Sequence, residues 1–119
     1  MSSRDLGFSV EARAEAFLEA QGLTTIDRNY SCRFGEVDLI MRDGEALVFV
    51  EVRGRSSERF GKAIESVTVQ KQRRIIATAA HYLQRQPGSA NKPCRFDVVG
   101  VLTCIEPPSI EWIRSAFDA

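Results

Sequence analysis

Acidic side chains interrupt two apolar segments of the chain at a spacing that could hold a metal ion. The sequence Asp43-Gly44 separates these segments and is a strong signal for a β-hairpin turn. With these two residues as the loop, Asp38 lies opposite Phe49, and Glu36 lies opposite Glu51. Side chains alternate between the faces of a strand, so one face of the hairpin is predicted to carry these charged residues: Glu36, Asp38, Glu51 and Arg53.

Asp38 and Glu51 are diagonal neighbours in this hairpin, with backbones about 7–8 Å apart. Two carboxylates at that separation can converge on one hard divalent cation. Mg²⁺ or Mn²⁺ suits them, because such ions bind a few carboxylates and keep several waters. Without a cation, the clustered acids would repel one another, and the charge of Glu51 must be paired, liganded or neutralised by a proton. The alternative is that Glu51 and Arg53 pair with solvated neighbours at a strand end.

The basic residues of the chain are concentrated in one stretch. The chain has 16 basic and 16 acidic residues, yet the segment 53–74 holds seven basic against two acidic ones, a local charge of +5. Such a surface can bind a polyanion even when the whole chain is neutral, although the same charges could form only a solvated surface. On the first interpretation, the residues that contact phosphate are Arg55, Lys62, Lys71 and Arg74.

Length and composition indicate one globular domain over residues 1–119. The chain is 44% hydrophobic and 27% charged, which is typical of a protein with an ordinary core. It has no apolar run of 18 or more residues, so no membrane association is expected. Its first residues lack a signal-peptide pattern, and three scattered cysteines do not suit a disulfide framework. A reduced, cytoplasmic protein is therefore expected, with the cysteines as core filler.

Hydrophobic periodicity predicts the elements that position the acids. Helical spacing over 4–21 and 69–86 predicts two amphipathic helices, the second capped by Thr68. The residues between 54 and 66 are predicted to form a loop. Strands are predicted at 23–32, 35–42, 46–53 and 94–103, with a short edge strand at 110–113. The order α-β-β-β-α-β indicates an α/β sandwich built round a mixed central sheet.

Three motifs together resemble those of the YraN-type family of uncharacterised bacterial proteins: GEVDLI at 35–40, VFVEVR at 48–53 and RFDVV at 95–99. The resemblance runs from about Gly7 to the carboxyl end. That family in turn resembles the PD-(D/E)XK endonuclease-like fold, which includes archaeal Holliday-junction resolvases. The resemblance implies a restriction-endonuclease-like three-layer sandwich whose core order, α-β-β-β-α-β, agrees with the order of the predicted elements.

The resemblance also implies a metal site. Asp38 matches the first metal-binding acid and Glu51 the second, while Glu11 resembles the additional amino-terminal acid of the resolvase-like members. A Mg²⁺ or Mn²⁺ ion bound by Asp38, Glu51 and the Val52 carbonyl would activate water against a phosphodiester and neutralise the developing charge. Lys71 and Gln72 resemble the polar residues that the second core helix brings near such sites.

The chain departs from the motif at two positions. Val37 replaces the usual proline, which matters little because a glycine-glutamate turn serves the same purpose. Arg53 replaces the usual catalytic lysine. Arginine stays protonated and prefers bidentate contacts with oxyanions, so Arg53 can orient a phosphate but cannot relay a proton. Arginine is tolerated at this place within YraN-type proteins.

These observations predict a metal-dependent nuclease-like protein whose partner is nucleic acid, with structured DNA as the first expectation and RNA as the second. One alternative is a nucleic-acid-binding module without turnover, and another is a protein-interaction domain whose acids form only salt bridges. Trp112 is interpreted as a packing anchor or as part of a homodimer surface. Asp97 either makes a structural or site-supporting hydrogen bond or is exposed, and His81 is expected at the surface or half-buried, not as a catalytic base.

Overall fold

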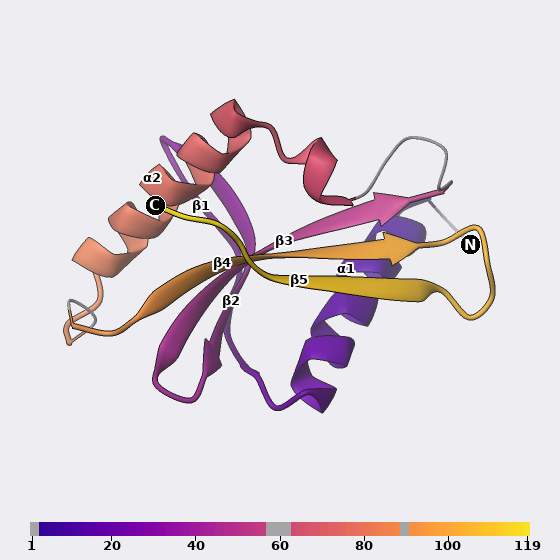
Figure 1. Ribbon diagram of the computed structural model, residues 1–119, viewed down its shortest axis with the longest axis horizontal. Helices are drawn as coiled ribbons and strands as arrows, with labels where there is room; N and C mark the ends of the chain where they lie inside the picture. Colours follow the sequence, from indigo (N-terminus) through magenta and orange to yellow (C-terminus); the bar gives the residue numbers. More distant parts are fainter. Residues whose placement is uncertain (1–2, 57–62, 89–90) are drawn as a thin grey trace.

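A five-stranded mixed sheet forms the centre of the molecule, with the strand order β1-β2-β3-β4-β5 (Figure 1). The computed structural model describes residues 3–56, 63–88 and 91–119. The strands are β1 (Thr24–Cys32), β2 (Gly35–Asp43), β3 (Ala46–Arg55), β4 (Cys94–Leu102) and β5 (Ser109–Phe117). β3 and β4 run parallel, because a helix carries the chain back between them, and the other neighbouring strands are antiparallel. The predicted mixed α/β sheet is confirmed.

Two helices and a short 3₁₀ helix complete the described part of the chain. Helix α1 spans Ser3–Ala20, η2 spans Ala63–Ser66 and α2 spans Val69–Gln84. Thr68 caps α2 as predicted, because its hydroxyl accepts a hydrogen bond from the Lys71 N–H at 3.2 Å. η2 occupies the end of the segment predicted as a loop. Neither α1 nor α2, as far as they are described, is long and apolar enough to span a membrane.

The two helices lie on opposite faces of the sheet. Phe49 of β3 packs in one buried cluster with Ile75 of α2, whereas the adjacent Val50 packs in a second cluster with Leu18 of α1. Successive strand residues point to opposite faces, so the helices must cover different sides. Figure 1 shows α2 along one side of the sheet and α1 across the other. The buried run of β3 confirms the prediction of a central strand between two layers.

The β2–β3 hairpin turns one residue later than the sequence predicts. Asp43 pairs with Ala46, so the loop residues are Gly44 and Glu45, and not Asp43 and Gly44. Gly44 has φ +60° at the first loop position, as a type II′ turn requires. The predicted register, with Asp38 opposite Phe49, is therefore wrong, because Ile40 pairs with Phe49. The error is two residues along the partner strand, so the parity that places Asp38 and Glu51 on one face is preserved.

Two further predictions need correction. The last strand is not a short segment at 110–113 but runs over nine residues, interrupted by a bulge opposite β4 where Ser115 adopts φ +50°. Cys94 and Cys104 are exposed, so they do not fill the core. Cys94 is the first residue of β4, and Cys104 follows the strand's end, where both side chains reach water. Trp112 is a packing anchor: its ring meets that of Phe17 edge to face, with centroids 6.2 Å apart.

Candidate functional site

The predicted acids converge on a pocket of about 340 Å³ where β2 and β3 separate. The two strands pair as far as Leu39 and Val50, and both continue beyond that pair without further pairing to each other. Side chains from both helix layers reach the opening. We call it the acidic pocket, and its lining residues are Glu11, Gly35, Glu36, Asp38, Glu51, Val52, Arg53, Lys71, Arg74 and Ile75.

Asp38 bridges the two strands at this point. Its Oδ2 accepts a hydrogen bond from the Val52 N–H at 2.8 Å, in place of a backbone carbonyl of β2. The regular alternation of faces is also broken here, because Val37 packs in the α2-side cluster and Leu39 in the α1-side cluster. In an antiparallel ladder one residue directs its N–H and C=O to the same neighbouring strand, so the Val52 carbonyl faces this opening too.

Glu51 is a buried acid that shares a hydrogen bond with another acid, Asp38. Only 6% of the residue is exposed. Burial, then a hydrogen bond with Asp38, then the Asp38 charge raise its pKa to about 8, against the opposing charges of Arg53 and Lys71. At neutral pH Glu51 is therefore mostly protonated. Of the three fates that the sequence allows for this charge, neutralisation by a proton is the one that the raised pKa favours without a cation.

Two more carboxylates increase the negative charge of the pocket. Glu11 of α1 and Glu36 of β2 both line it. Partial burial raises the pKa of Glu11, and the charges of Asp38 and Glu36 raise it further. Acids from the helix and the hairpin thus influence one another electrostatically, as the predicted placement of Glu11 requires.

Cationic side chains line the same pocket. Arg53 has buried Nε and Nη2 atoms without a hydrogen-bond partner among the described residues. A buried donor without an acceptor costs free energy, and its position marks a place where an oxyanion would be favoured. Guanidinium groups bind such anions through two parallel hydrogen bonds. Lys71 is half-buried and Arg74 is exposed at the start of α2, where both contribute to the lining.

The remaining predicted site residues lie elsewhere. Gln72 donates its side-chain N–H to the Val67 carbonyl at 3.1 Å, which ties α2 to the preceding turn. Neither Gln72 nor Arg55 is among the described residues that line the acidic pocket. Lys62 lies outside the described residues. Gly35 was not among the predicted site residues, although its position directly before the acidic motif was a usable signal. It has φ +148° and passes close to Thr78 and Arg74 of α2.

The donor set of the acidic pocket fits a hard divalent cation. Asp38 and Glu51 provide two carboxylates, and the Val52 carbonyl faces the same opening. Among the described residues, no three His, Cys, Asp or Glu side chains stand in a metal-binding arrangement. Mg²⁺ is often bound by one or two carboxylates and several waters, so two acids suffice for such an ion. A cation would also remove the reason for Glu51 to hold a proton.

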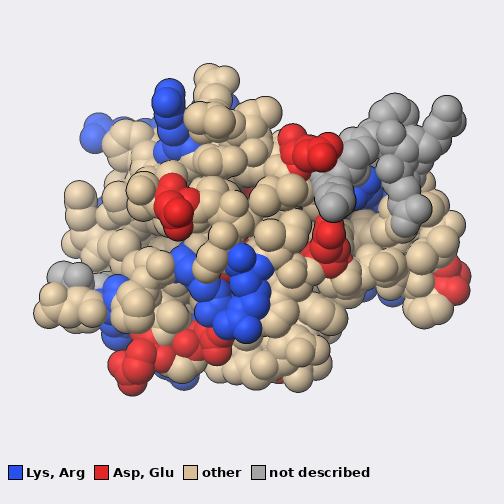
Figure 2. Space-filling model, in the orientation of Figure 1, with Lys and Arg blue, Asp and Glu red and all other residues tan. Residues whose placement is uncertain are grey.

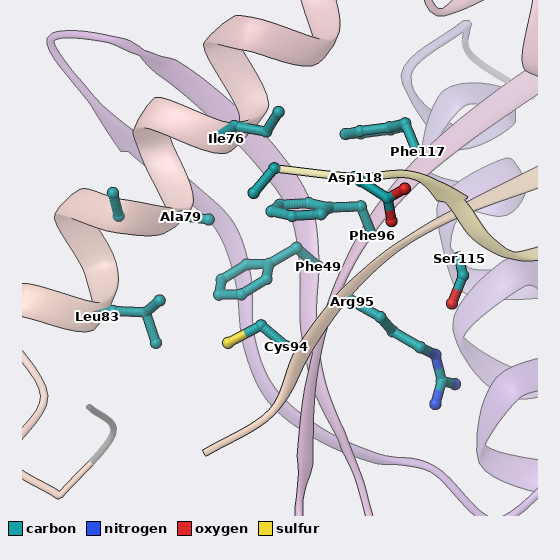
Figure 3. A pocket seen from close by; sticks show the side chains of 12 residues that line it. Phe49, Ile76, Ala79, Leu83, Cys94, Arg95, Phe96, Ser115, Phe117 and Asp118 are labelled. Carbon is teal, nitrogen blue, oxygen red and sulfur yellow. The ribbon is translucent and has the colours of Figure 1, made fainter. Parts of the chain in front are cut away.

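A second cavity, shown in Figure 3, has a different character. It measures about 250 Å³ and lies between α2 and the end of β5. Its wall is aromatic, with Phe96 stacked between Phe49 and Phe117 at centroid distances of 5.6 and 5.1 Å. Arg95 points away from these rings in Figure 3. This cavity lies below the size of most ligand pockets and its lining is mainly apolar, so the acidic pocket is the better candidate site.

The face drawn in Figure 2 carries β5 and one side of α2. There the described charged side chains form small groups of either sign between uncharged residues. A polyanion would find no continuous attraction along these described groups, because acidic side chains interrupt the basic ones. The cations that line the acidic pocket are therefore the better candidates for phosphate contacts.

Comparison with known proteins identifies the family. The model of the "Uncharacterised protein family UPF0102" matches residues 10–101. A UPF0102 protein of Nitrosococcus oceani is 55% identical over 114 residues, covering 96% of this chain and 92% of the relative. One from Nitrosomonas europaea is 52% identical over 117 residues, covering 98% and 97%, and one from Hahella chejuensis is 50% identical over 118 residues, covering 99% and 94%. The chain belongs to the UPF0102 family, which confirms the YraN-type resemblance of its motifs.

Proposed function

We propose that the protein is a metal-dependent nuclease-like hydrolase that binds structured DNA or RNA and cleaves its phosphodiester backbone. The observation that carries this proposal is that Asp38 and buried Glu51 line one pocket with Arg53, whose buried Nε and Nη2 donors have no partner among the described residues. The carboxyl groups of Asp38 and Glu51 can bind a divalent cation, and the unpartnered donors of Arg53 can bind an oxyanion. The element order, with one helix on each face of the sheet, supports a restriction-endonuclease-like fold as part of the same proposal.

Asp38, Glu51 and the Val52 carbonyl would hold Mg²⁺ or Mn²⁺, with Glu11 near enough to influence the charge of the site. When bound, such an ion supplies an activated water and stabilises negative charge on phosphorus oxygens. Glu51 would release its proton to solvent and would hold the ion as a carboxylate. Arg53 orients the phosphate through its free donors, and it moves no proton because arginine stays charged.

Cleavage assays with branched and linear DNA test this proposal directly. We expect Mn²⁺-dependent cleavage by the wild type and a loss of at least about 100-fold in Asp38→Asn and Glu51→Gln, since both changes remove charge where it is needed. Glu45→Gln is the matched control, because it changes an exposed acid at the opposite end of the same hairpin and should leave cleavage unchanged. Cleavage that needs no divalent metal, or that survives Asp38→Asn, would contradict the metal site.

Arg53 favours one second candidate, a nucleic-acid-binding module without turnover, because it stands where the motif has a lysine and cannot relay a proton. Salt-dependent binding without cleavage would support this module. In either case Lys71→Ala and Arg74→Ala should each reduce the slope of log affinity against log salt by about one. Arg42→Ala, an exposed arginine near the hairpin turn, is the control. Salt-independent behaviour of the wild type would instead favour a protein-interaction domain.

A further inference from the structure

The turn between β1 and β2 presents an aromatic ring and a guanidinium to solvent beside the acidic pocket. Phe34 is 41% exposed although it is a large apolar residue. Arg33, also exposed, places its guanidinium carbon 4.8 Å from the centroid of the Phe34 ring. The guanidinium therefore stacks over the ring, and we call this exposed cationic and aromatic pair the Arg33–Phe34 platform.

The platform stands a short distance from the pocket along α2. Gly35, the next residue, lines the acidic pocket and passes close to Arg74. The Phe34 ring lies 6.3 Å from the ring of His81, seven residues further along the helix. Seven residues of α-helix span about 10 Å. At about 3.4 Å per stacked nucleotide, this distance corresponds to about three nucleotides of one strand. Figure 1 shows the β1–β2 turn reaching up beside α2.

The residues behind the platform fix its position. The Tyr30 hydroxyl and His81 Nδ1 form a hydrogen bond of 2.6 Å between β1 and α2. The Tyr30 ring also meets the Tyr82 ring edge to face, with centroids 5.2 Å apart. These contacts hold the end of β1 against the helix. A surface fixed in this way loses little conformational entropy when a flat ligand stacks on it.

We propose that the Arg33–Phe34 platform stacks an unpaired nucleobase of the strand whose phosphate occupies the acidic pocket. This inference rests on the proposed function and narrows its substrate class to nucleic acid with an unpaired or displaced strand. Aromatic rings and arginine planes both stack on exposed bases, whereas bases inside a duplex have both faces covered. The platform would then recognise the base by stacking. The phosphates would be contacted by the pocket cations Arg53, Lys71 and Arg74.

Binding of a short single-stranded DNA and of the matching duplex, measured side by side by fluorescence anisotropy, tests the platform. Phe34→Leu keeps the apolar bulk and loses the aromatic face, so it should weaken single-strand binding by about 5- to 100-fold. It should change duplex binding less than about twofold and leave the salt slope unaltered, because no charge is removed. Phe34→Trp keeps an aromatic face and should retain single-strand affinity. Ile26→Ala, another exposed apolar residue of β1, should bind like the wild type.

The outcomes separate this inference from the proposed function. Wild-type binding that depends on Arg74 but is unaffected by Phe34→Leu would overturn the platform and leave the nuclease proposal standing. An equal loss for single strand and duplex would also overturn it, because the ring would then serve folding or general contact. A wild-type protein that binds neither nucleic acid would overturn both.

Discussion

Two buried carboxylates on adjacent parallel strands have opposite surroundings. Asp97 of β4 is fully buried, and its oxygens accept hydrogen bonds from Arg95 Nε at 3.1 Å, Trp112 Nε1 at 2.9 Å and the Ser115 N–H at 3.0 Å. Glu51 of β3 pairs in register with the residue next to Asp97. It is almost as buried, but its hydrogen-bond partner is a second acid. The sheet thus surrounds Asp97 with hydrogen-bond donors, whereas it places Glu51 beside a second acid.

The difference separates a structural acid from the acid that we propose to be functional. Asp97 fastens the bulge of β5 to β4, so its hydrogen bonds fix the edge of the sheet. Of the roles that the sequence left open for it, the structural hydrogen bond is the one observed. The surroundings of Glu51 destabilise its charged form. Such an arrangement is typical of sites that await a ligand or a proton transfer.

Asp97→Asn should give the largest effect. The amide would place an N–H group against donors and leave Arg95 with less compensating charge inside the protein. We expect a loss of about 3–5 kcal/mol in the free energy of unfolding, as for other broken buried ion pairs. Urea denaturation in EDTA and in Mn²⁺ measures it, and the loss should be the same in both. A loss below about 1 kcal/mol would show that Asp97 is not the structural partner in this comparison.

Glu51 should make stability fall with rising pH. Its pKa is about 8 in the folded protein, against an ordinary value of 4.5. Between these values the folded chain binds more protons than the unfolded chain, so the free energy of unfolding must decrease as the pH rises. We expect a decrease of about 2–4 kcal/mol between about pH 5 and pH 9 in EDTA, measured by urea denaturation.

Glu51→Gln is the control for this pH dependence. The amide cannot titrate, so the variant should lose most of the decrease and become more stable than the wild type at the alkaline end. Glu11 also has a raised pKa, so the difference between the two proteins, and not either curve alone, reports on Glu51. Parallel curves for wild type and variant would show that Glu51 is as well compensated as Asp97.

Asp38 substitutions should change the free energy of unfolding least, and they best distinguish a metal ligand from a structural hydrogen-bond acceptor. Asp38→Asn keeps an oxygen for the Val52 N–H and removes one charge, so metal-free stability should be unchanged or rise by up to about 1 kcal/mol. Asp38→Ala leaves that N–H without an acceptor and should cost about 1–3 kcal/mol. At Mn²⁺ ten times above its Kd, the wild type should gain about 1.4 kcal/mol, and both variants should gain nothing. Mn²⁺ stabilisation of Asp38→Asn in thermal melts would place the ion elsewhere.

The local pattern of the sequence was sufficient for both long helices, the first four strands, the family and the identity of the acids. The apolar run of β3 with one acid in it predicts a buried strand whose charge needs an explanation, and this inference does not depend on register. Period-two alternation assigned Asp38 and Glu51 to one face, and a shift of two residues preserves that face. Thr68 predicted the start of α2, because its hydroxyl can cap the helix. Each of these features depends either on residues close in sequence or on the alternation of side chains between the two faces of a strand. A register shift of two residues does not change that alternation.

The tertiary structure alone decided how the acids meet. The turn type at Gly44 depends on the twist of both strands, so Asp43-Gly44 indicated a hairpin without fixing its loop. The hydrogen bond from Val52 to Asp38 forms because β2 leaves β3 to follow β1, a competition between distant segments. The bulge of β5 likewise forms because Asp97, on another strand, accepts the Ser115 N–H. Long-range packing set these contacts, and with them the raised pKa of Glu51, because burial and neighbouring charge exist only once the sheet has formed.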